Sequence, residues 1–403
     1  MSAREGTLMG AYAGVEEIPP DTIFGLSATF AADPRPNKVS LGVGVFRNEQ
    51  LKVPVLRCVQ EAEKRLAAEG RTKSYLPIDG DPEFIRRTAE IAFGKECPQL
   101  KAGRIYGGQM VGGSGALRVV GEFLQRTLGK EEIYLPDPSW ANHYGIFSAC
   151  RLKTVSYPYY DQEKRRLAFD PLIKALKGMR AGSVILFHLC CHNPTGVDPS
   201  PDQWRKIAAV VKEQGLIPLF DCAYQGFGHT MDEDPFALRH FVAEEIESIL
   251  CYSYSKNFSL YAERVGALFI MTQSPEEAHR VGSQVRRKIR ENYSNPPAHG
   301  ARVVAAVVND PELNALWHEE IKGMRKRIHE MRQALIDGLR DKGDFAFLEG
   351  QQGLFSFCGL TGAQTKILQE KYALYMPPNG RINVTGINRG NLDYVIGAIA
   401  DVL

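Results

Sequence analysis

The strongest constraint on the fold is an alternation of apolar, strand-like runs with helical patterns between about residues 105 and 272. Several of the runs are continuously apolar, as strands that are buried on both faces of a sheet should be. Helical patterns lie between most of them, for example at 201–214, where Pro201 stands near the first turn. The alternation predicts an α/β fold with a mostly parallel sheet. The predicted strands are 132–136, 153–158, 183–189, 217–221, 248–253 and 265–271.

A different pattern follows after about residue 308. Apolar side chains recur there at three- and four-residue steps from 313 to 339, which predicts one long amphipathic helix. The remaining segments, including 354–360 and 381–387, are typical of a smaller α/β lobe. Because a chain of 403 residues is too long for one simple core, we expect two lobes.

Charge and composition indicate which classes of binding partner are unsupported. The chain has 49 Lys and Arg against 47 Asp and Glu, and this balance does not support binding to nucleic acid or to an anionic membrane. No apolar run approaches the roughly 20 residues that span a bilayer. The first residues include acidic side chains and resemble neither a signal nor a transit peptide, so we expect a cytoplasmic location. The eight cysteines are expected to be reduced thiols.

The segment HLCCH at 188–192 is a possible metal-binding motif. Zinc sites usually separate paired ligands by about two to four residues. Adjacent residues of a strand point to opposite faces of a sheet, so this segment would not gather its ligands on one side. We therefore interpret it as a buried strand that runs into a loop, and we expect no metal.

Polar residues that directly follow the predicted strands should carry the function. In α/β sheets, ligands bind outside the carboxyl ends of the strands. If the sheet is wound in the expected way, these polar segments converge on one crevice. They are 112–114, 138–140, 193–196, 221–224 and 253–256.

One of these segments predicts an anion site. Gly112, Gly113 and Ser114 stand at the head of a helical pattern, where free amides and the helix dipole favour a negative charge. A tight turn between strand and helix explains the same glycines equally well. Ser253 and Arg264 favour the phosphate interpretation, because the planar guanidinium fits phosphate with two hydrogen bonds.

Two further residues predict cofactor chemistry. Lys256 follows an apolar strand, a context that can lower the pKa of a lysine and make it an amine nucleophile; a solvated loop lysine is the alternative. Asp221 ends a buried strand and needs a positive or hydrogen-bonding partner. A protonated pyridine nitrogen would be such a partner and would keep the ring an electron sink, whereas a helix cap is the plainer role.

The residues around them fit a flat ring that carries a phenolate oxygen. Tyr224 and Asn193 could donate hydrogen bonds to that oxygen, and Trp140 could stack on the ring. His143 could support Asp221 from behind. For each residue taken singly, a rim, turn or core position is a reasonable alternative.

Together these residues resemble the class I aminotransferases, and specifically the aspartate aminotransferase family. This likeness implies a pyridoxal-phosphate-dependent transferase of fold type I. It has a large domain with a mostly parallel, seven-stranded sheet between helices, and a smaller α/β domain. The likeness runs almost end to end, through 41–47, 74–80, 112–118, 137–143, 192–199, 221–227, 253–266, 292–302, 353–357 and 380–386.

The resemblance implies a role for each matching residue of the cofactor site. Lys256 would bind pyridoxal 5′-phosphate as a Schiff base and move the substrate proton, with Asp221 at the pyridine nitrogen. Catalytic roles are implied for Lys256, Asp221, Tyr224 and Trp140. The residues implied to bind the cofactor are Tyr75 (from the neighbouring subunit), Gly113, Ser114, Trp140, Asn193, Asp221, Tyr224, Ser253, Lys256 and Arg264.

The resemblance also implies how a substrate is held. Arg381 would bind the α-carboxylate, and Arg290 would bind the side-chain carboxylate across the interface of a homodimer. Gly44 lies in a loop that closes over the substrate, which Trp140 and Asn193 would also contact. Two arginines at opposite ends fix the orientation of a dicarboxylic amino acid.

The implied organisation has an N-terminal arm at 1–17, a large domain at 53–308, and a small domain formed by 18–52 and 309–403. The implied reaction is a ping-pong transfer from L-aspartate to 2-oxoglutarate, which yields oxaloacetate and L-glutamate. Gly112 and Ser114 depart from the residues usual in aspartate-preferring members. Together with the segments 190–196 and 256–261, these two residues favour the branch of the family that also accepts tyrosine or phenylalanine.

Three alternatives remain. A pyridoxal-dependent lyase or decarboxylase could use the same fold, although Arg290 and Arg381 favour transamination of a diacid. A non-catalytic binding protein could keep the scaffold, although the chemically active residues are intact. A nicotinamide dehydrogenase is disfavoured because no complete GxGxxG motif precedes a helix.

Overall fold

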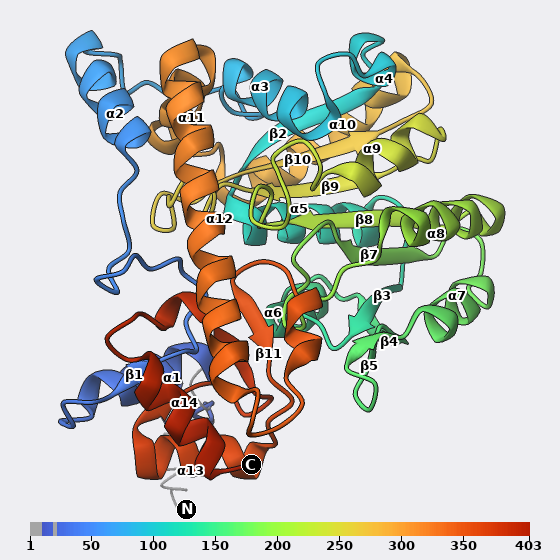
Figure 1. The fold of residues 1–403 in the computed structure, drawn as a ribbon. Helices are drawn as coiled ribbons and strands as arrows, with labels where there is room; N and C mark the ends of the chain where they lie inside the picture. Colours follow the sequence, from blue (N-terminus) through green and yellow to red (C-terminus); the bar gives the residue numbers. More distant parts are fainter. Residues whose placement is uncertain (1–9, 19–21) are drawn as a thin grey trace, which may run out of the picture.

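The computed structural model describes residues 10–18 and 22–403, which are built around one seven-stranded sheet (Figure 1). The strand order is β2-β10-β9-β8-β7-β3-β4, and β10 is antiparallel to both of its neighbours. The other pairs are parallel, so the predicted α/β fold is confirmed. The strands are β2 (Ile105–Val111), β3 (Glu132–Asp137), β4 (Lys153–Pro158), β7 (Val184–His188), β8 (Ile217–Cys222), β9 (Ile249–Ser253) and β10 (Val265–Met271).

Helices cover both faces of this sheet, and alternate residues of each strand serve different faces. Leu186 and Leu219 belong to a core cluster shared with α5 (Gly112–Arg126) and α10 (Pro275–Tyr293). Phe187 and Phe220 point the other way, toward α8 (Pro201–Gln214) and α9 (Phe236–Ala243). The central strands are therefore buried throughout, which explains their continuously apolar sequences.

The connections between the strands confirm the predicted helix at 201–214 and add further elements. The capping box of Ser200 and Gln203 opens α8 at the predicted residue. The remaining elements around the sheet are α2 (Arg57–Glu69), α3 (Pro82–Phe93), α4 (Pro98–Lys101), α6 (Ala141–Ala149), β5 (Tyr160–Asp161), β6 (Arg166–Leu167), α7 (Phe169–Lys177) and α11 (Ala298–Asn309).

The segment at 22–40 and the C-terminal part of the chain pack together below the sheet, at the lower part of Figure 1. There β1 (Val39–Ser40) pairs with β12 (Leu374–Tyr375), and β11 (Phe355–Phe357) pairs with β13 (Arg381–Asn383). The predicted long helix is confirmed as α12 (Pro311–Leu339), which runs from the level of the sheet into this lower part (Figure 1). The other elements are α1 (Thr22–Ala32), η1 (Ala346–Gly350), α13 (Gly362–Tyr372), η2 (Val384–Gly386) and α14 (Leu392–Asp401).

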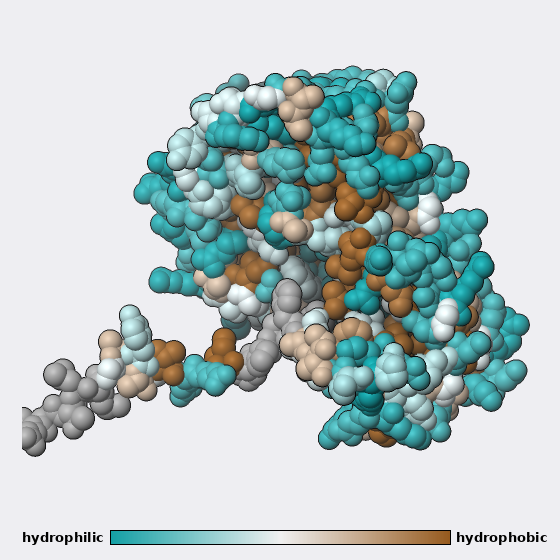
Figure 2. All heavy atoms as spheres, turned by 90° about the vertical axis from the view of Figure 1, so that its left-hand side faces the viewer, coloured by the Kyte–Doolittle hydropathy of each residue, from teal (hydrophilic) through white to brown (hydrophobic). Residues whose placement is uncertain are grey.

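Residues 10–18 lie apart from the rest of the described chain, with Tyr12 84% and Ile18 82% exposed (Figure 2). Apolar side chains also interrupt the hydrophilic surface on the face that Figure 2 shows. Among the helices of the described ranges, none has the length and apolar character needed to cross a bilayer.

Candidate active site

Several of the predicted site residues come together at the carboxyl ends of the parallel strands. Asp221 lies near the end of β8, in register with His188 of β7 and Cys251 of β9. Ser253 ends β9, and Lys256 follows it in the loop that leads to β10. This convergence was expected, because parallel strands end at the same edge of a sheet.

A hydrogen-bonded chain of side chains supports Asp221. The Nε2 atom of His143 lies 3.0 Å from Oδ2 of Asp221, and Ser139 Oγ lies 2.9 Å from the other ring nitrogen of His143. Ser139 Oγ also lies 3.3 Å from Nε2 of His188, whose Nδ1 accepts from the backbone N–H of Asn193. The sequence predicted His143 in this role, but it did not identify Ser139 or His188.

The directions of these hydrogen bonds follow from their two ends. The N–H of Asn193 can only donate, so His188 carries its proton on Nε2 and donates to Ser139. The ionised carboxylate of Asp221 can only accept, so His143 donates to it from Nε2. Burial lowers the pKa of His188 to about 3, which keeps this ring neutral. The segment 188–192 thus serves hydrogen bonding.

The chain keeps Asp221 ionised. Burial alone would raise the pKa of this carboxyl, which is 8% exposed. The hydrogen bond from His143 and the positive charge around Asp221, which includes Lys256, together outweigh burial, so the pKa lies below its usual value. The second carboxylate oxygen accepts no hydrogen bond from any residue that the structure describes, so it is available to a ligand.

Lys256 is a partly buried amine with no hydrogen-bond partner among the described residues. Its Nζ atom lies 5.1 Å from the ring centroid of Tyr224. Burial lowers the pKa of Lys256 to about 8, although the charge of Asp221 opposes this shift. A lysine with such a pKa is a usable nucleophile and base near neutral pH.

The N-terminus of α5 and two side chains near it form a candidate anion site. No side chain caps the N-terminus of α5, so its first amides are open to a ligand. The guanidinium of Arg264 packs on Gly112, where an added Cβ would come within 2.6 Å of Nη2. Ser253 packs against Gly113 in the same way, because a Cβ added to Gly113 would lie 3.2 Å from the Cβ of Ser253. Gly112 also has a φ of +67°, which favours glycine at this position.

Arg381 provides a further positive group, near Phe355 and Tyr224, and its own hydrogen bonds are to neutral oxygens. Its Nη1 donates to Asn193 Oδ1 at 3.1 Å and its Nη2 to the carbonyl of Gly42 at 2.6 Å. Its Nε is buried without a partner among the described residues. The guanidinium lies 4.0 Å from the ring centroid of Phe355, and burial lowers the pKa of Arg381 to about 10. This side chain has donors left for a carboxylate.

The remaining predicted residues lie around these groups. Tyr224 is 6% exposed, and burial raises the pKa of its hydroxyl, which therefore stays protonated and can donate. Trp140 is partly buried and stands edge-on to His143, with ring centroids 5.2 Å apart. Ser114 is partly exposed in the first turn of α5. Gly44 faces Phe355, whose Cζ lies 3.0 Å from the position of an added Cβ.

Two predicted residues point to solvent in this single chain. Tyr75 is 88% exposed, and Arg290 is exposed on α10, where it donates to Ser294. Both were predicted to serve the site of a neighbouring subunit, and both stay predictions for an assembled dimer.

Sequence reasoning missed several residues of the site. Ser255 is buried and accepts a hydrogen bond from Ser253 at 3.1 Å. Phe355 supports Arg381, and its ring also lies 6.1 Å from that of Tyr224. Phe355 belongs to the GLFSF segment, which carried the family resemblance, but its sequence alone indicates only an apolar strand.

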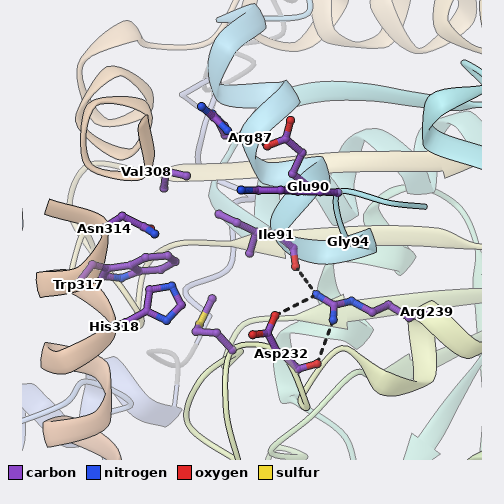
Figure 3. Close-up of a pocket in the computed structure, with 12 residues that line it drawn as sticks. Arg87, Glu90, Ile91, Gly94, Asp232, Arg239, Val308, Asn314, Trp317 and His318 are labelled. Atoms are coloured by element: carbon purple, nitrogen blue, oxygen red, sulfur yellow. Dashed lines mark hydrogen bonds and ion pairs between the residues drawn. The ribbon is translucent and has the colours of Figure 1, made fainter. Parts of the chain in front are cut away.

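The pocket in Figure 3 is a different cavity, of about 390 Å³. None of the predicted site residues lines it. Its arginines are already engaged, since Arg239 donates to the carbonyls of Ile91 and Asp232 and pairs with the Asp232 carboxylate at 3.6 Å (Figure 3). Trp317 forms one wall and donates to the carbonyl of Asn257. The arginines of this pocket are therefore not free to bind a ligand.

Comparisons with known proteins agree with this geometry. The family model "Aminotransferase class I and II" matches residues 36–399. The chain is 45% identical to an aspartate aminotransferase of Escherichia coli, over 97% of this chain and 100% of the relative. It is 43% identical to an aromatic-amino-acid aminotransferase of Pseudomonas aeruginosa, over 98% and 99%. A crystal structure of an aromatic-amino-acid aminotransferase from Burkholderia pseudomallei, covalently bound to pyridoxal phosphate, is similar with a TM-score of 0.95 and 45% identity, over 98% and 100%.

Proposed function

This chain belongs to the class I and II aminotransferases, and from that premise we propose that it is a pyridoxal phosphate-dependent aspartate aminotransferase. It transfers the amino group of L-aspartate to 2-oxoglutarate by a ping-pong reaction, and it also accepts aromatic amino acids. The observation that carries the proposal is the grouping of the amine of Lys256 over the ring of Tyr224, the buried carboxylate of Asp221, and the guanidinium of Arg381, which shares the ring of Phe355 with Tyr224.

The residues of the site fit the cofactor. The open N-terminus of α5, Ser253 and Arg264 suit a phosphate, because each supplies N–H or O–H donors or positive charge. The free oxygen of Asp221 suits a protonated pyridine nitrogen, and the hydroxyl of Tyr224 and the amide of Asn193 suit a phenolate oxygen. When bound, pyridoxal phosphate supplies an electron sink for the bonds at the substrate α-carbon.

The chain's own residues then perform the remaining tasks. Arg381 binds the α-carboxylate of the amino acid through the donors that the protein leaves free, and this contact orients the α-carbon. Lys256 takes the α-proton as general base, because burial keeps part of its amine neutral near pH 8. Asp221 stays ionised through the hydrogen bond from His143. Trp140 provides an aromatic face at the ring position.

The substrate range is tested with the holoenzyme. Steady-state rates are measured for L-aspartate and for L-tyrosine, each with 2-oxoglutarate as acceptor. We expect turnover of both amino acids. Negligible turnover of tyrosine would remove the aromatic substrates from the proposal, and absence of aspartate turnover would refute it. Release of carbon dioxide or ammonia in place of an oxo acid would favour the decarboxylase or lyase alternative.

We further propose the organisation that the resemblance implies: an arm at 1–17, a large domain at 53–308, a small domain formed by 18–52 and 309–403, and a cytoplasmic homodimer. Residues 1–9 of the arm lie outside the described residues. The exposed apolar side chains of Tyr12, Val15 and Ile18 support coverage of the arm by a second subunit. The eight cysteines are free, in keeping with a reducing compartment. A molar mass of one chain in light scattering would contradict the dimer.

A further inference from the structure

Arg332 of α12 is a buried cation without a carboxylate partner among the described residues. It is only 2% exposed, and burial lowers the pKa of its guanidinium to about 10. Nε donates to Ser356 Oγ at 3.0 Å, while Nη2 donates to the carbonyls of Phe355, at 3.2 Å, and Gly353. Nη1 is buried with no partner in the described chain. Burying a charge in this way costs free energy, which favours a functional role for Arg332.

The atoms that Arg332 holds belong to the strand that supports Arg381. Its hydrogen bonds end on β11 and on the residues just before it. β11 pairs with β13 so that Phe357 stands opposite Arg381. From the same strand, the ring of Phe355 lies 4.0 Å from the guanidinium of Arg381 and also faces Tyr224 and Gly44. Arg332 therefore reaches the substrate-binding arginine through one strand and one aromatic ring.

The local fold has other anchors that perform the structural task. The side chain of Gln351 bonds to both the N–H and the carbonyl of Phe357, at 2.9 and 3.2 Å. The backbone N–H of Gln352 donates to the carbonyl of Gly196 at 2.6 Å. The β-bridge to β13 adds further bonds. Arg332 is therefore one of several groups that keep this strand in register.

We propose that Arg332 is a positioning residue for the α-carboxylate of the substrate. It holds the backbone at 353–356 so that Phe355 keeps the guanidinium of Arg381 in the orientation that binds a carboxylate. Its positive charge, behind the strand, also adds to the field that attracts an anionic substrate. This inference rests on the proposed function, and it specifies how that site obtains its affinity for carboxylates.

The test compares Arg332→Met and Arg332→Lys with wild-type holoenzyme. Lys326→Met is the matched control, because Lys326 lies on the same helix with a side chain that is 77% exposed. The measurements are kcat and KM for L-aspartate, and the Kd of succinate, a dicarboxylate that cannot react. We expect Arg332→Met to raise KM and the succinate Kd by about 10- to 100-fold with little change in kcat, since small misplacements of a binding group have effects of this size. For Arg332→Lys, KM and the succinate Kd should lie between those of wild type and Arg332→Met. For Lys326→Met, both should equal the wild-type values.

A double-mutant cycle decides whether Arg332 acts through Phe355. Phe355→Leu removes the ring under Arg381 and should raise the succinate Kd by itself. Adding Arg332→Met to it should cause little further loss, because both changes affect the same contact. Additive effects, or a fall in kcat at unchanged KM and Kd, would overturn the proposal. So would failure of both Arg332 variants to fold, which would show a purely structural role. Since succinate binding needs no turnover, these results are distinguishable from a failure of the proposed reaction.

Discussion

The Nε2 atom of His143 lies 3.0 Å from the Oδ2 atom of Asp221, and both side chains are buried. His143 is the last member of a hydrogen-bonded chain that also contains Ser139 and His188. The arrangement keeps a negative charge ionised in a place where burial opposes it. The state of Asp221 thus depends on residues that do not contact the ligand site themselves.

Replacing His143 should therefore lower the activity and the affinity for the cofactor without abolishing either. In His143→Leu, burial is no longer balanced by a hydrogen bond, so the pKa of Asp221 should rise. We expect the acidic limb of the pH profile of kcat/KM to move to higher pH, and the affinity for pyridoxal phosphate to fall. His143→Asn, which keeps an N–H donor, should be milder. Equal profiles for wild type and His143→Leu would show that the hydrogen bond does not control Asp221.

Replacement of Lys256 should remove both covalent binding and proton transfer. Lys256→Ala should lack the absorbance band of covalently held cofactor and should lose roughly 10²- to 10⁴-fold in kcat, because a positioned general base contributes on that order. The control is Lys326→Ala, which removes an exposed lysine. Substantial turnover by Lys256→Ala would contradict the mechanism.

The lowered pKa of Lys256 has its own consequence in the cofactor-free protein. The neutral amine is the nucleophile, and its pKa is about 8. The rate at which the apoprotein takes up pyridoxal phosphate covalently should rise about tenfold per pH unit below pH 8 and level off above it. Stopped-flow absorbance measures this rate. A midpoint near pH 10.5, the ordinary value for lysine, would show that burial does not act as described.

Arg381→Lys should impair substrate binding despite its conserved charge. A lysine cannot reproduce the planar fork that bonds Asn193 and Gly42 while leaving donors for a carboxylate. We expect kcat/KM for L-aspartate to fall roughly 10- to 100-fold, with bound cofactor unchanged by absorbance. Wild-type kinetics in Arg381→Lys would place the α-carboxylate elsewhere.

Protonation of His188 should make the fold sensitive to acid. The folded protein keeps this ring neutral down to about pH 3, whereas the unfolded chain binds a proton near pH 6.5. The unfolded state thus carries more protons between these values, and the free energy of unfolding should decrease as the pH falls through this window. His188→Gln should reduce the slope of the free energy of unfolding against pH by up to about 1.4 kcal/mol per pH unit, as measured by urea titrations. His279→Gln, which changes an exposed histidine, is the control and should keep the wild-type slope.

Mixing two inactive variants tests whether Arg290 serves the partner subunit. A heterodimer of Lys256→Ala and Arg290→Ala contains one site with an intact Lys256 from one chain and an intact Arg290 from the other. Random mixing should restore about a quarter of wild-type activity toward aspartate, because half of the dimers carry one complete site. If Arg290 acts within its own chain, mixing restores nothing.

Much of the fold could be predicted because its signals are local. The strands β3, β4, β7, β8, β9 and β10 match the predicted segments within about a residue at either end, and α8 and α12 match equally well. Their apolar runs and periods reflect burial by neighbouring layers, which a sequence records directly. The positions of Asp221 and Lys256 followed from the same logic, since polar residues at strand ends meet at one edge.

The sequence by itself determined the order of the elements, the strand ends that meet, and the residue types available for chemistry. Only the tertiary structure decided which of these residues touch and how charged they are. Arg381 and Asn193, 188 positions apart, share a hydrogen bond. Arg332 of the helix α12 reaches Ser356 of the strand β11. The pKa values of Lys256 and Asp221 likewise come from burial and partners supplied by several elements. Such contacts depend on long-range packing, for which no local sequence period exists.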